Sequence, residues 1–251
     1  MNAPRPRVWV CVPTYDEADN IARMAAALTE VFERHDIDGR VLFIDDRSPD
    51  GTGAIADRLA AADPRVLALH RARKSGIGPA YRDGFRAALA AGADLVMEMD
   101  CDFSHDPREI PALLAAAAEA DVVLGSRYVP GGSVRDWGIV RRAISRGGCL
   151  YARLVLGVPI HDLTGGFKCF RSAVLAHLPL DEVSARGYGF QIEMTYRALL
   201  AGFHVTEVPI TFSDRTLGRS KMSRAIVLEA ATLVPRLRLR LRRTGARATP
   251  S

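Results

Sequence analysis

The feature that most constrains the fold is a regular alternation of short apolar runs with amphipathic helical patterns. Residues 8–12 and 41–44 are apolar runs of strand length, and residues 20–34 between them repeat apolar side chains at helical spacing. Alternating strands and helices are typical of a parallel sheet with helices on both faces. We therefore expect an α/β fold with a mostly parallel central sheet flanked by helices.

The same alternation extends over most of the chain. It predicts further strands at 66–69, 95–99, 122–124, 167–170 and 205–212. It predicts further helices at 54–62, through Phe85 and Leu89, at 107–118, at 140–156, at 190–200 and finally through Ala231. No linker rich in Ser, Pro or Gly and no internal repeat interrupts the pattern, so one continuous domain is expected.

Composition excludes several classes of protein. No stretch free of Asp, Glu, Lys and Arg exceeds nine residues, whereas a membrane-spanning helix needs about 20 apolar positions. The first apolar run is closed by Asp16 and Glu17, too early for a signal peptide, so we expect a cytoplasmic chain. The 4 cysteines are far apart and form no CxxC pair, which favours buried thiols over zinc ligands or disulfides.

The basic charge of the chain is concentrated at its C-terminus. The net charge is +5, yet the residues from 214 onward carry ten lysines and arginines against two acids. Six arginines between Arg236 and Arg247 could attract anionic lipid at about 1 kcal/mol per charge. The Leu–Arg alternation there could instead form a strand or stay disordered.

Polar segments follow five of the predicted strands, at the point where each strand ends. They are residues 13–17, Asp45–Asp46, Arg73–Lys74, residues 100–102 and Arg127. In open α/β sheets, ligands bind at the carboxyl edge of the strands. We therefore expect these segments to meet at one binding site.

The segment Asp100-Cys101-Asp102 has the composition of a site for a hard cation. Mg²⁺ and Mn²⁺ favour carboxylate oxygens together with substrate phosphates, and His105 is close enough in sequence to complete the shell. The alternative is a solvated turn in which Asp102 or Ser104 caps the next helix. Cys101 lies between two carboxylates, which raise the pKa of its thiol and argue against a nucleophile.

The first two strand ends carry residues suited to a nucleoside. Asp46 can accept hydrogen bonds from a ribose or a base, Tyr15 can stack, and Glu17 can accept a hydrogen bond. The alternative is that Asp46, Ser48 and Asp50 merely build a turn. The loop at residues 73–78 has neither Walker spacing nor a dinucleotide fingerprint, which argues against ATP hydrolysis and NAD chemistry.

Arginines and lysines in the second half suit phosphate groups. A guanidinium binds a phosphate bidentately and a lysine acts as a point charge, so Arg127, Arg215 and Lys221 could clamp one or two phosphates. A solvated basic face is the simpler interpretation of Arg141, Arg142 and Arg224.

The motifs, taken in order, resemble those of a known family. The segments VPTYDEADNI, IDDRSPDGT, DCDFSHDP, GSRYVPGG, DLTGGFKCFR, GYGFQIEM and VPITFSDRTLGRSKM resemble dolichol-phosphate or polyprenol-phosphate mannosyltransferases, which are family 2 glycosyltransferases. The resemblance runs from about Val8 to Met222. It implies a GT-A (nucleotide-diphospho-sugar transferase) fold, GDP-mannose as donor, a polyprenyl phosphate as acceptor, and inversion to a β-linked mannosyl phospholipid.

The resemblance also implies roles for particular residues. Donor binding is assigned to Pro13, Tyr15, Glu17, Ile44, Asp46, Asp100, Cys101, Asp102, Gln191 and Glu193. Mg²⁺ or Mn²⁺ is assigned to Asp100, Asp102 and His105, and catalysis to Asp102 and Arg127. Phosphate and acceptor binding is assigned to Arg127, Arg146, Arg215 and Lys221. Cys101 replaces the usual alanine of the D-A-D motif, which is tolerable if that position contributes mainly its backbone.

The expected organisation follows from this resemblance. Residues 1–235 form one GT-A domain, with a nucleotide-binding half at about 7–127 and an acceptor half at about 128–235, and residues 236–251 form a basic tail. A lipid acceptor requires a membrane surface, and some relatives rely on a separate integral membrane protein. We expect a peripheral protein at the inner face of the cell membrane, with such a protein as an optional partner.

Three other functions are weighed against this hypothesis. A UDP-glucose:polyprenyl-phosphate glucosyltransferase shares the early motifs, but Asp162 is followed here by LTGGFK, as in mannosyl relatives. A nucleic-acid-binding module would use the basic C-terminus, which lacks interleaved aromatics, so no nucleic acid partner is expected. A catalytically silent subunit is disfavoured by the intact Asp100, Asp102 and Arg127.

Overall fold

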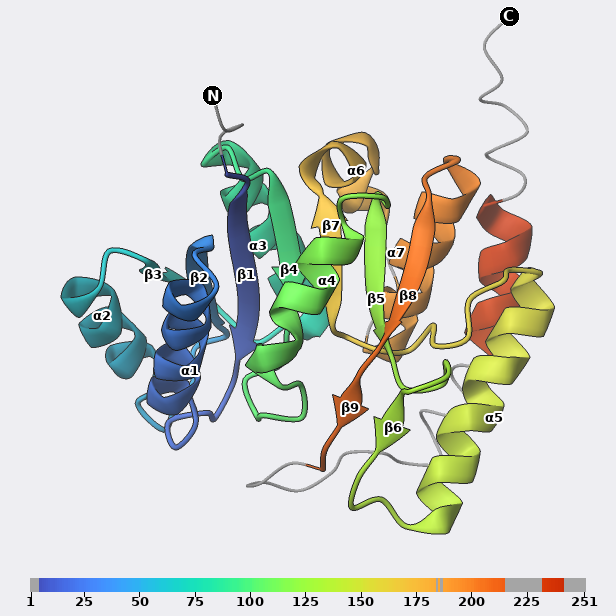
Figure 1. Ribbon diagram of the computed structural model, residues 1–251, viewed down its shortest axis with the longest axis horizontal. Helices are drawn as coiled ribbons and strands as arrows, with labels where there is room; N and C mark the ends of the chain where they lie inside the picture. The colour runs from blue at the N-terminus through green and yellow to red at the C-terminus, as the bar shows by residue number, and fades with distance from the viewer. Residues whose placement is uncertain (1–4, 184, 186, 215–231, 242–251) are drawn as a thin grey trace, which may run out of the picture.

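A central seven-stranded sheet organises the molecule (Figure 1), of which the computed structural model describes residues 5–183, 185, 187–214 and 232–241. The strands are β1 (Arg7–Thr14), β2 (Asp38–Asp45), β3 (Val66–His70), β4 (Leu95–Glu98), β5 (Val122–Ser126), β7 (Lys168–Arg171) and β8 (Val205–Pro209). Their order is β3-β2-β1-β4-β7-β5-β8, and β7 alone among them runs antiparallel to its neighbours. The expected mostly parallel sheet is confirmed.

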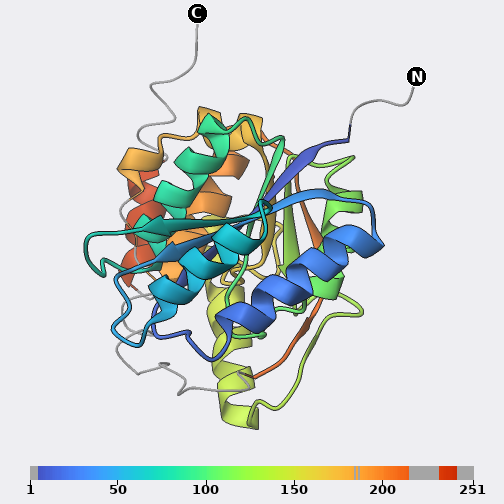
Figure 2. The same cartoon turned by 90° about the vertical axis from the view of Figure 1, so that its left-hand side faces the viewer.

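Helices cover both faces of this sheet (Figure 2). They are α1 (Ile21–Arg34), α2 (Thr52–Ala62), α3 (Ile77–Ala90), α4 (Ile110–Ala116), α5 (Ile139–Leu156), α6 (Ser172–His177), α7 (Tyr188–Leu200), and the short 3₁₀ helices η1 (Pro107–Glu109) and η2 (Leu180–Glu182). A further helix spans residues 232–241. The flanked α/β architecture predicted from the alternation of apolar patterns is therefore the one observed.

Two hydrophobic cores form because strand side chains alternate between the faces of the sheet. Cys11 of β1 points into the core shared with α3 and α7, whereas Val10 and Val12 point into the core shared with α1 and α4. The side chains of α1 that enter the core have the helical spacing seen in the sequence, and they include Ile21, Met24, Leu28, Val31 and Phe32. Burial of this apolar face supplies the main stabilisation of the helix.

One predicted element is divided in the structure. The strand expected at 205–212 forms β8 and then, after Ile210, a separate strand β9 (Thr211–Phe212) that pairs in parallel with β6 (Ser133–Val134). Ile210 lies between the two strands, and its carbonyl accepts a hydrogen bond from the backbone N–H of Ser133. This contact connects the end of the large sheet to the small one. The last predicted helix, through Ala231, lies outside the described residues.

The helix at 232–241 crosses the expected domain boundary at residue 235. Val234, Leu237 and Leu241 are buried at spacings of three and four residues and join the core that contains α5 and α7. The strand suggested by the Leu–Arg alternation is therefore not formed over 236–241, where the chain is helical and buries about one residue per turn rather than every second residue. Within the described residues, no helix combines the length and the hydropathy needed to span a bilayer.

Two neighbouring leucines of this helix test its packing. Leu237 is 2% exposed and Leu239 is 61% exposed. We predict that Leu237→Ala lowers the free energy of unfolding by about 2–5 kcal/mol, as removal of a buried leucine side chain generally does. Leu239→Ala should change it by less than about 0.5 kcal/mol. Urea unfolding followed by circular dichroism measures both, and equal effects of the two substitutions would contradict the packing of this helix.

Candidate active site

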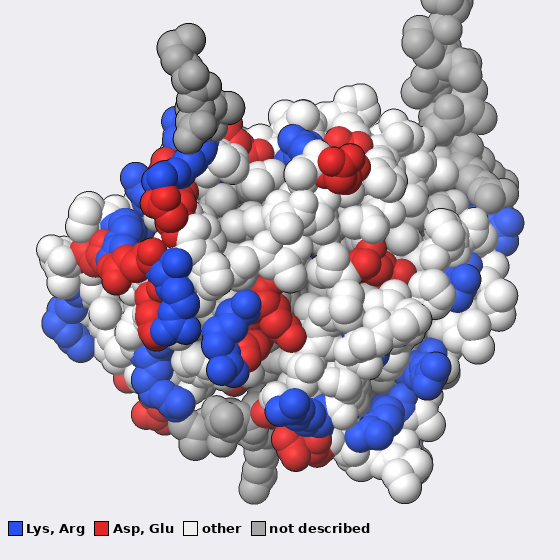
Figure 3. Space-filling view, viewed as in Figure 1, with Lys and Arg blue, Asp and Glu red and all other residues white. Residues whose placement is uncertain are grey.

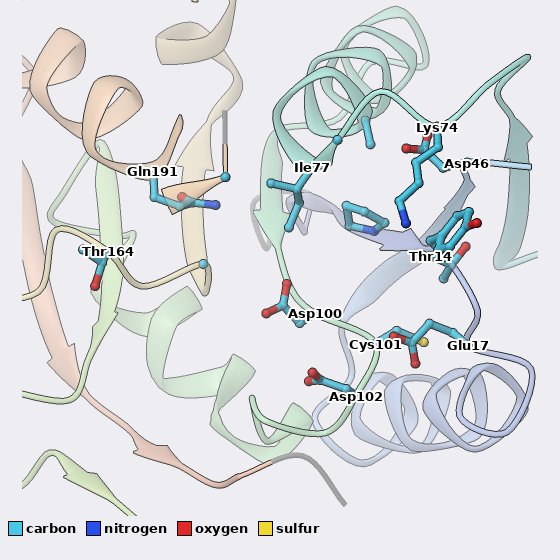
Figure 4. Close-up of a pocket in the computed structure, with 16 residues that line it drawn as sticks. Thr14, Glu17, Asp46, Lys74, Ile77, Asp100, Cys101, Asp102, Thr164 and Gln191 are labelled. Carbon is cyan, nitrogen blue, oxygen red and sulfur yellow. The ribbon is translucent and has the colours of Figure 1, made fainter. Parts of the chain in front are cut away.

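A cavity of about 380 Å³ lies at the edge of the sheet where β1, β2 and β4 end (Figure 4). It is lined by Pro13, Thr14, Tyr15, Glu17, Asp46, Lys74, Gly76, Ile77, Ala80, Asp100, Cys101, Asp102, Thr164, Gly166, Gly187 and Gln191. Small-molecule sites have volumes of about 300–1,000 Å³. The cavity therefore has the size of a site for a small molecule such as a nucleotide.

The topology of the sheet explains where this cavity forms. The chain leaves β1 toward β2 and β3 on one side, whereas β4 lies on the other side of β1. Loops after adjacent parallel strands diverge at such a switch point and leave a crevice for a ligand. The segments after β1 and β4, residues 13–17 and 100–102, form its walls, as the sequence predicted.

The loops that follow β1, β2 and β4 each contain a residue with left-handed backbone. Asp16, Arg47 and Phe103 have φ angles of 60°, 59° and 60°. Residues other than glycine seldom adopt this conformation, and the surrounding contacts must compensate its cost of roughly 1 kcal/mol or more. Such strained positions cluster at functional sites, and here each is next in sequence to a residue that lines the cavity.

Hydrogen bonds from the loop after β2 hold the loop after β1 in place. The backbone N–H of Asp16 donates to Ser48 Oγ at 3.2 Å, and that of Glu17 donates to Thr52 Oγ1 at 3.0 Å. The Ser48 hydroxyl in turn donates to the buried carboxylate of Asp45 at 2.5 Å. Asp45 and Ser48 are therefore structural residues that fix Asp16, and Thr52 fixes Glu17 at the cavity wall.

Asp46 lines the cavity and is fixed from behind by the loop that follows β3. Its carboxylate pairs with Arg71 and accepts a hydrogen bond from the Ser75 backbone N–H at 3.3 Å. Arg71 also pairs with Asp83 of α3 at 2.8 Å. The orientation of Asp46 is therefore set before any ligand binds. Sequence reasoning missed Arg71, because its partners are distant along the chain.

Asp100 and Asp102 bring two carboxylates to the cavity from one short loop. Asp102 also accepts a hydrogen bond from the Ser104 backbone N–H at 3.0 Å. Both residues are buried, and the cap of η1 is Asp106, which accepts from the Arg108 backbone N–H, so the solvated turn with a cap at Asp102 or Ser104 is not formed. No cluster of three His, Cys, Asp or Glu side chains within the described residues is placed to hold a metal ion. Two carboxylates fit Mg²⁺ or Mn²⁺ if substrate phosphates and water supply the other ligands.

Cys101 lies between these carboxylates with its side chain almost fully buried. Burial, together with the charges of Glu17, Asp102 and Asp100, raises the pKa of its thiol well above the ordinary value. The thiolate that nucleophilic catalysis requires is therefore scarce. This confirms the direction of the shift expected from sequence.

His105, expected as a metal ligand, is not among the residues that line the cavity. Its imidazole is fully buried between the rings of Phe167 and Phe212, with centroid distances of 5.1 and 5.3 Å. Nδ1 accepts a hydrogen bond from the Asp100 backbone N–H at 3.3 Å. Burial lowers the pKa of the ring, which is therefore neutral at pH 7, and the contact positions the Asp100 loop.

Arg127, expected as a phosphate ligand, is also outside the cavity lining and forms a buried ion pair with Asp162. Its Nε and one terminal nitrogen each donate to the Asp162 carboxylate at 2.6 Å, and its backbone N–H donates at 3.0 Å. The same terminal nitrogen donates to Thr164 Oγ1 at 2.8 Å. Because Thr164 lines the cavity, Arg127 acts on the site through that residue.

The pKa of Asp162 reflects this pairing. Burial alone would raise it, but the charge of Arg127 and the hydrogen bonds from its guanidinium and backbone N–H lower it below the ordinary value. The carboxylate is therefore ionised throughout the neutral pH range. The guanidinium also lies within 5.8 Å of the ring centroids of Tyr128, Trp137 and Phe212, so aromatic rings surround the charge pair.

Three further predicted residues lie away from the cavity. Ile44 is fully buried in the core against Gly84, and Glu193 is buried in ion pairs with Arg197 and Arg240. Arg146 is exposed on α5. The predicted residues that the structure brings to the cavity are Pro13, Tyr15, Glu17, Asp46, Asp100, Cys101, Asp102 and Gln191. Arg215 and Lys221 lie outside the described residues.

Lys74 lines the cavity, as expected for one of the five polar strand-end segments, although no role was assigned to it, and Thr164 lines the cavity without having been predicted. Lys74 is the one lysine or arginine among the described residues of the lining, and its Nζ lies 3.2 Å from the centroid of the Tyr15 ring. Figure 4 shows Lys74 near Asp46 on one side of the cavity, with Thr164 and Gln191 across from them. No sequence signal pointed to Thr164, whose place at the cavity depends on tertiary packing.

An α/β fold with a cavity at the switch point of its sheet has the architecture that many nucleotide-binding proteins share. The sequence profile described as "Glycosyl transferase family 2" matches residues 9–178. The chain is 46% identical over 242 residues to the undecaprenyl-phosphate mannosyltransferase of Micrococcus luteus, covering 96% of this chain and 98% of that protein. It is 46% identical over 250 residues to the polyprenol monophosphomannose synthase of Mycolicibacterium smegmatis, covering 97% and 91%. The chain belongs to glycosyl transferase family 2.

Solved structures of more distant proteins share the fold. Mannosyl-3-phosphoglycerate synthase from Rubrobacter xylanophilus superimposes with a TM-score of 0.67 at 17% identity, covering 98% of this chain and 77% of that one. Glucosyl-3-phosphoglycerate synthase from Mycobacterium tuberculosis, in complex with phosphoglyceric acid, gives 0.65 at 18% identity, covering 92% and 80%. The expected GT-A fold is thereby confirmed.

The buried ion pair can be tested by removing one charge. We predict that Asp162→Asn lowers the free energy of unfolding at pH 7 by about 3–5 kcal/mol, because it leaves the Arg127 charge buried without a counter-ion. Since the pKa of Asp162 is lowered in the folded state, its contribution is complete at pH 7 and is lost only as the pH falls below the ordinary value of 3.8. The difference between wild type and variant should therefore narrow in strong acid.

Urea unfolding at several pH values measures this effect, with Asp36→Asn as the matched control. Asp36 forms an exposed ion pair with Arg5 and has the left-handed backbone that asparagine tolerates. The control should leave stability unchanged within error. If both variants lost similar amounts of unfolding free energy, the buried Arg127–Asp162 pair would contribute no more to stability than an exposed pair does.

Proposed function

We propose that this chain transfers mannose from GDP-mannose to a polyprenyl phosphate with inversion, giving a polyprenyl β-D-mannosyl phosphate. The observation that carries this proposal is the 46% identity, over nearly the whole chain, to two proteins named as a mannosyltransferase and a monophosphomannose synthase. The cavity supports it, because paired carboxylates and residues suited to a nucleoside meet there.

The donor would lie across the switch point of the sheet. The residues proposed to hold the guanosine are Pro13, Tyr15, Glu17 and Asp46, and those proposed at the diphosphate are Asp100, Cys101 and Asp102. Asp46 is held by Arg71, so its carboxylate is oriented before a ribose or a base N–H arrives. Gln191, across the cavity, is proposed to contact the sugar.

A divalent cation, Mg²⁺ or Mn²⁺, is proposed at Asp100 and Asp102. Two fold neighbours support this: a glucosyl-3-phosphoglycerate synthase structure contains Mn²⁺ with UDP, and another contains Mg²⁺ with UDP. When bound, such an ion would neutralise negative charge on the departing diphosphate. The hydrogen bond from the Ser104 backbone N–H orients the Asp102 carboxylate for this role.

The acceptor chemistry needs no general base. A phosphate monoester is anionic at neutral pH, so its oxygen can attack the anomeric carbon without losing a proton. Catalysis then rests on positioning and charge neutralisation. Arg215 and Lys221 are proposed to bind the acceptor phosphate, and Arg127 is proposed to position Thr164 at the cavity wall.

The acceptor also determines where the protein must act. A polyprenyl chain resides in a bilayer, so we propose peripheral contact with the cytoplasmic face of the cell membrane. A separate integral membrane protein remains an optional partner, and nucleic acid plays no part in the proposed reaction.

The direct test is transfer of radiolabelled sugar into the organic phase. Purified protein, Mg²⁺ and polyprenyl phosphate in detergent are incubated with GDP-mannose or UDP-glucose in parallel. We predict label transfer from GDP-mannose, and a loss of more than about 100-fold in Asp102→Ala. Asp106→Ala is the matched control, because Asp106 follows in the same loop but pairs with the exposed Arg108 outside the cavity.

Either of two results would contradict the proposal. Transfer from UDP-glucose alone would replace it with the glucosyl alternative, whose nucleotide is the one found in the solved fold neighbours. Wild-type turnover in Asp102→Ala would exclude Asp102 as a ligand of the catalytic metal ion.

A second prediction concerns Lys74. Lys74 is the one positively charged side chain among the described residues that line the cavity. It is therefore placed to contact the negative charge of a nucleotide sugar. We predict that Lys74→Met raises the KM for GDP-mannose about tenfold or more, since a hydrogen bond to a charged group is worth about 1.5–3 kcal/mol. Steady-state kinetics measure this effect. Arg73→Met, at the adjacent exposed residue outside the cavity lining, should leave the KM unchanged, and equal effects would contradict the role of Lys74.

A further inference from the structure

Helix α5 exposes an unusual amount of apolar surface. Of the large apolar side chains exposed in the described part of the chain, most belong to this helix, with exposed fractions between 44% and 86%. They are Ile139, Val140, Ile144, Leu150 and Leu154. Single exposed apolar residues are ordinary, but a group on one element indicates an interaction surface.

These side chains form a stripe opposite the face that packs on the protein. At about 100° per residue, Ile139, Leu150 and Leu154 lie on one side of the helix, with Val140 and Ile144 next to them. The buried residues Cys149, Ala152 and Leu156 lie on the other side. Helix α5 therefore has two apolar faces, of which only the inner one is covered by the described residues.

The charge on α5 is all of one sign. The helix contains Arg141, Arg142, Arg146 and Arg153 and no aspartate or glutamate. At the same spacing, Arg142, Arg146 and Arg153 lie along one margin of the apolar stripe. Arg141 lies beyond the other margin, where it pairs with Asp214 at 2.8 Å, so the charge offered to a partner comes from the first three. Figure 3 shows blue side chains among white atoms at the right-hand edge of the molecule, over α5 and the helix 232–241.

The inner face of α5 contacts the candidate active site. Ser145 accepts a hydrogen bond from the hydroxyl of Tyr128 at 2.7 Å. Cys149 Sγ lies 3.2 Å from the hydroxyl of Thr164, which lines the cavity. The beginning of α5 extends past the end of the sheet at which β1 and β8 terminate (Figure 1). The outer face therefore lies on a helix whose inner face helps to build the site.

We propose that the outer face of α5, defined by the five exposed apolar residues and the arginines beside them, docks on the surface of a bilayer that contains anionic phospholipids. An apolar stripe bordered by arginines is typical of a helix that lies in the plane of the membrane interface. The choice of occupant follows from the charge. A second copy meeting this face through the same face would oppose arginine to arginine, whereas anionic headgroups complement it.

This inference deepens the proposed function and rests on it in one respect: docking would hold the site against the membrane in which a polyprenyl phosphate resides. The surface itself is defined without reference to turnover. Docking and transfer can therefore be measured separately.

The test is sedimentation of the full chain with vesicles of phosphatidylcholine alone or mixed with phosphatidylglycerol. We predict binding to the mixed vesicles, weakened by salt. The double substitution Leu150→Glu/Leu154→Glu should weaken it by at least about tenfold, because two carboxylates would enter the apolar stripe. Leu200→Glu is the matched control, because Leu200 is 45% exposed at the end of α7, away from α5. This variant should bind the mixed vesicles as tightly as the wild type does.

Further measurements keep the outcomes distinct. Circular dichroism and GDP binding should be unchanged in the double variant, which shows that it is folded with an intact cavity. Transfer to a short, water-soluble isoprenyl phosphate should also be unchanged, whereas transfer to polyprenyl phosphate in vesicles should fall. Failure of the wild type to transfer to either acceptor would count against the proposed function and leave the vesicle result standing.

Three results would overturn the docking proposal. Equal vesicle binding by wild type and the double variant would place the contact elsewhere. Equal binding to vesicles with and without phosphatidylglycerol would show that the arginines of α5 do not contact anionic headgroups. A wild-type dimer that the double variant converts to a monomer, with no vesicle binding by either, would assign the face to a second copy of the chain.

Discussion

The second half of the structure depends on the buried ion pair between Arg127 and Asp162. Two desolvated charges are tolerated only when hydrogen bonds satisfy them, and here the guanidinium and a backbone N–H both donate to the carboxylate. The backbone N–H groups of His161 and Asp162 donate in turn to Glu207 of β8 at 2.8 Å. The pair thus links the end of β5, the turn that carries Thr164, and β8.

The cavity joins this fixed half to a second preorganised half. On the nucleotide side, loops with left-handed residues are held by hydrogen bonds between strand ends, and Arg71 orients Asp46. On the other side, Thr164 is held by Arg127 and by α5. The proposed reaction, in which two anionic substrates lie beside each other, gains most from such rigidity, because proximity and orientation replace general-base chemistry in it.

Much of this arrangement could be predicted from the sequence, since strand ends in a parallel sheet share one edge. The loop at 100–102 reached the cavity for that reason. The ion pairs of Arg127 and Glu193 could not be predicted in the same way, because their partners are set by tertiary packing. Asp162 lies 35 residues from Arg127 along the chain, and Glu193 pairs with Arg240 of the helix 232–241. Local spacing likewise gave no sign that His105 would be buried between two aromatic rings.

The loop containing Asp100 and Asp102 is proposed to bind a nucleoside diphosphate together with a divalent cation. Isothermal titration of GDP into the protein, with Mn²⁺ or with a chelator, tests it most directly. We expect one GDP site whose affinity falls by at least about tenfold when the metal is removed, since the carboxylates then repel the diphosphate. Equally tight binding in the chelator would contradict the claim.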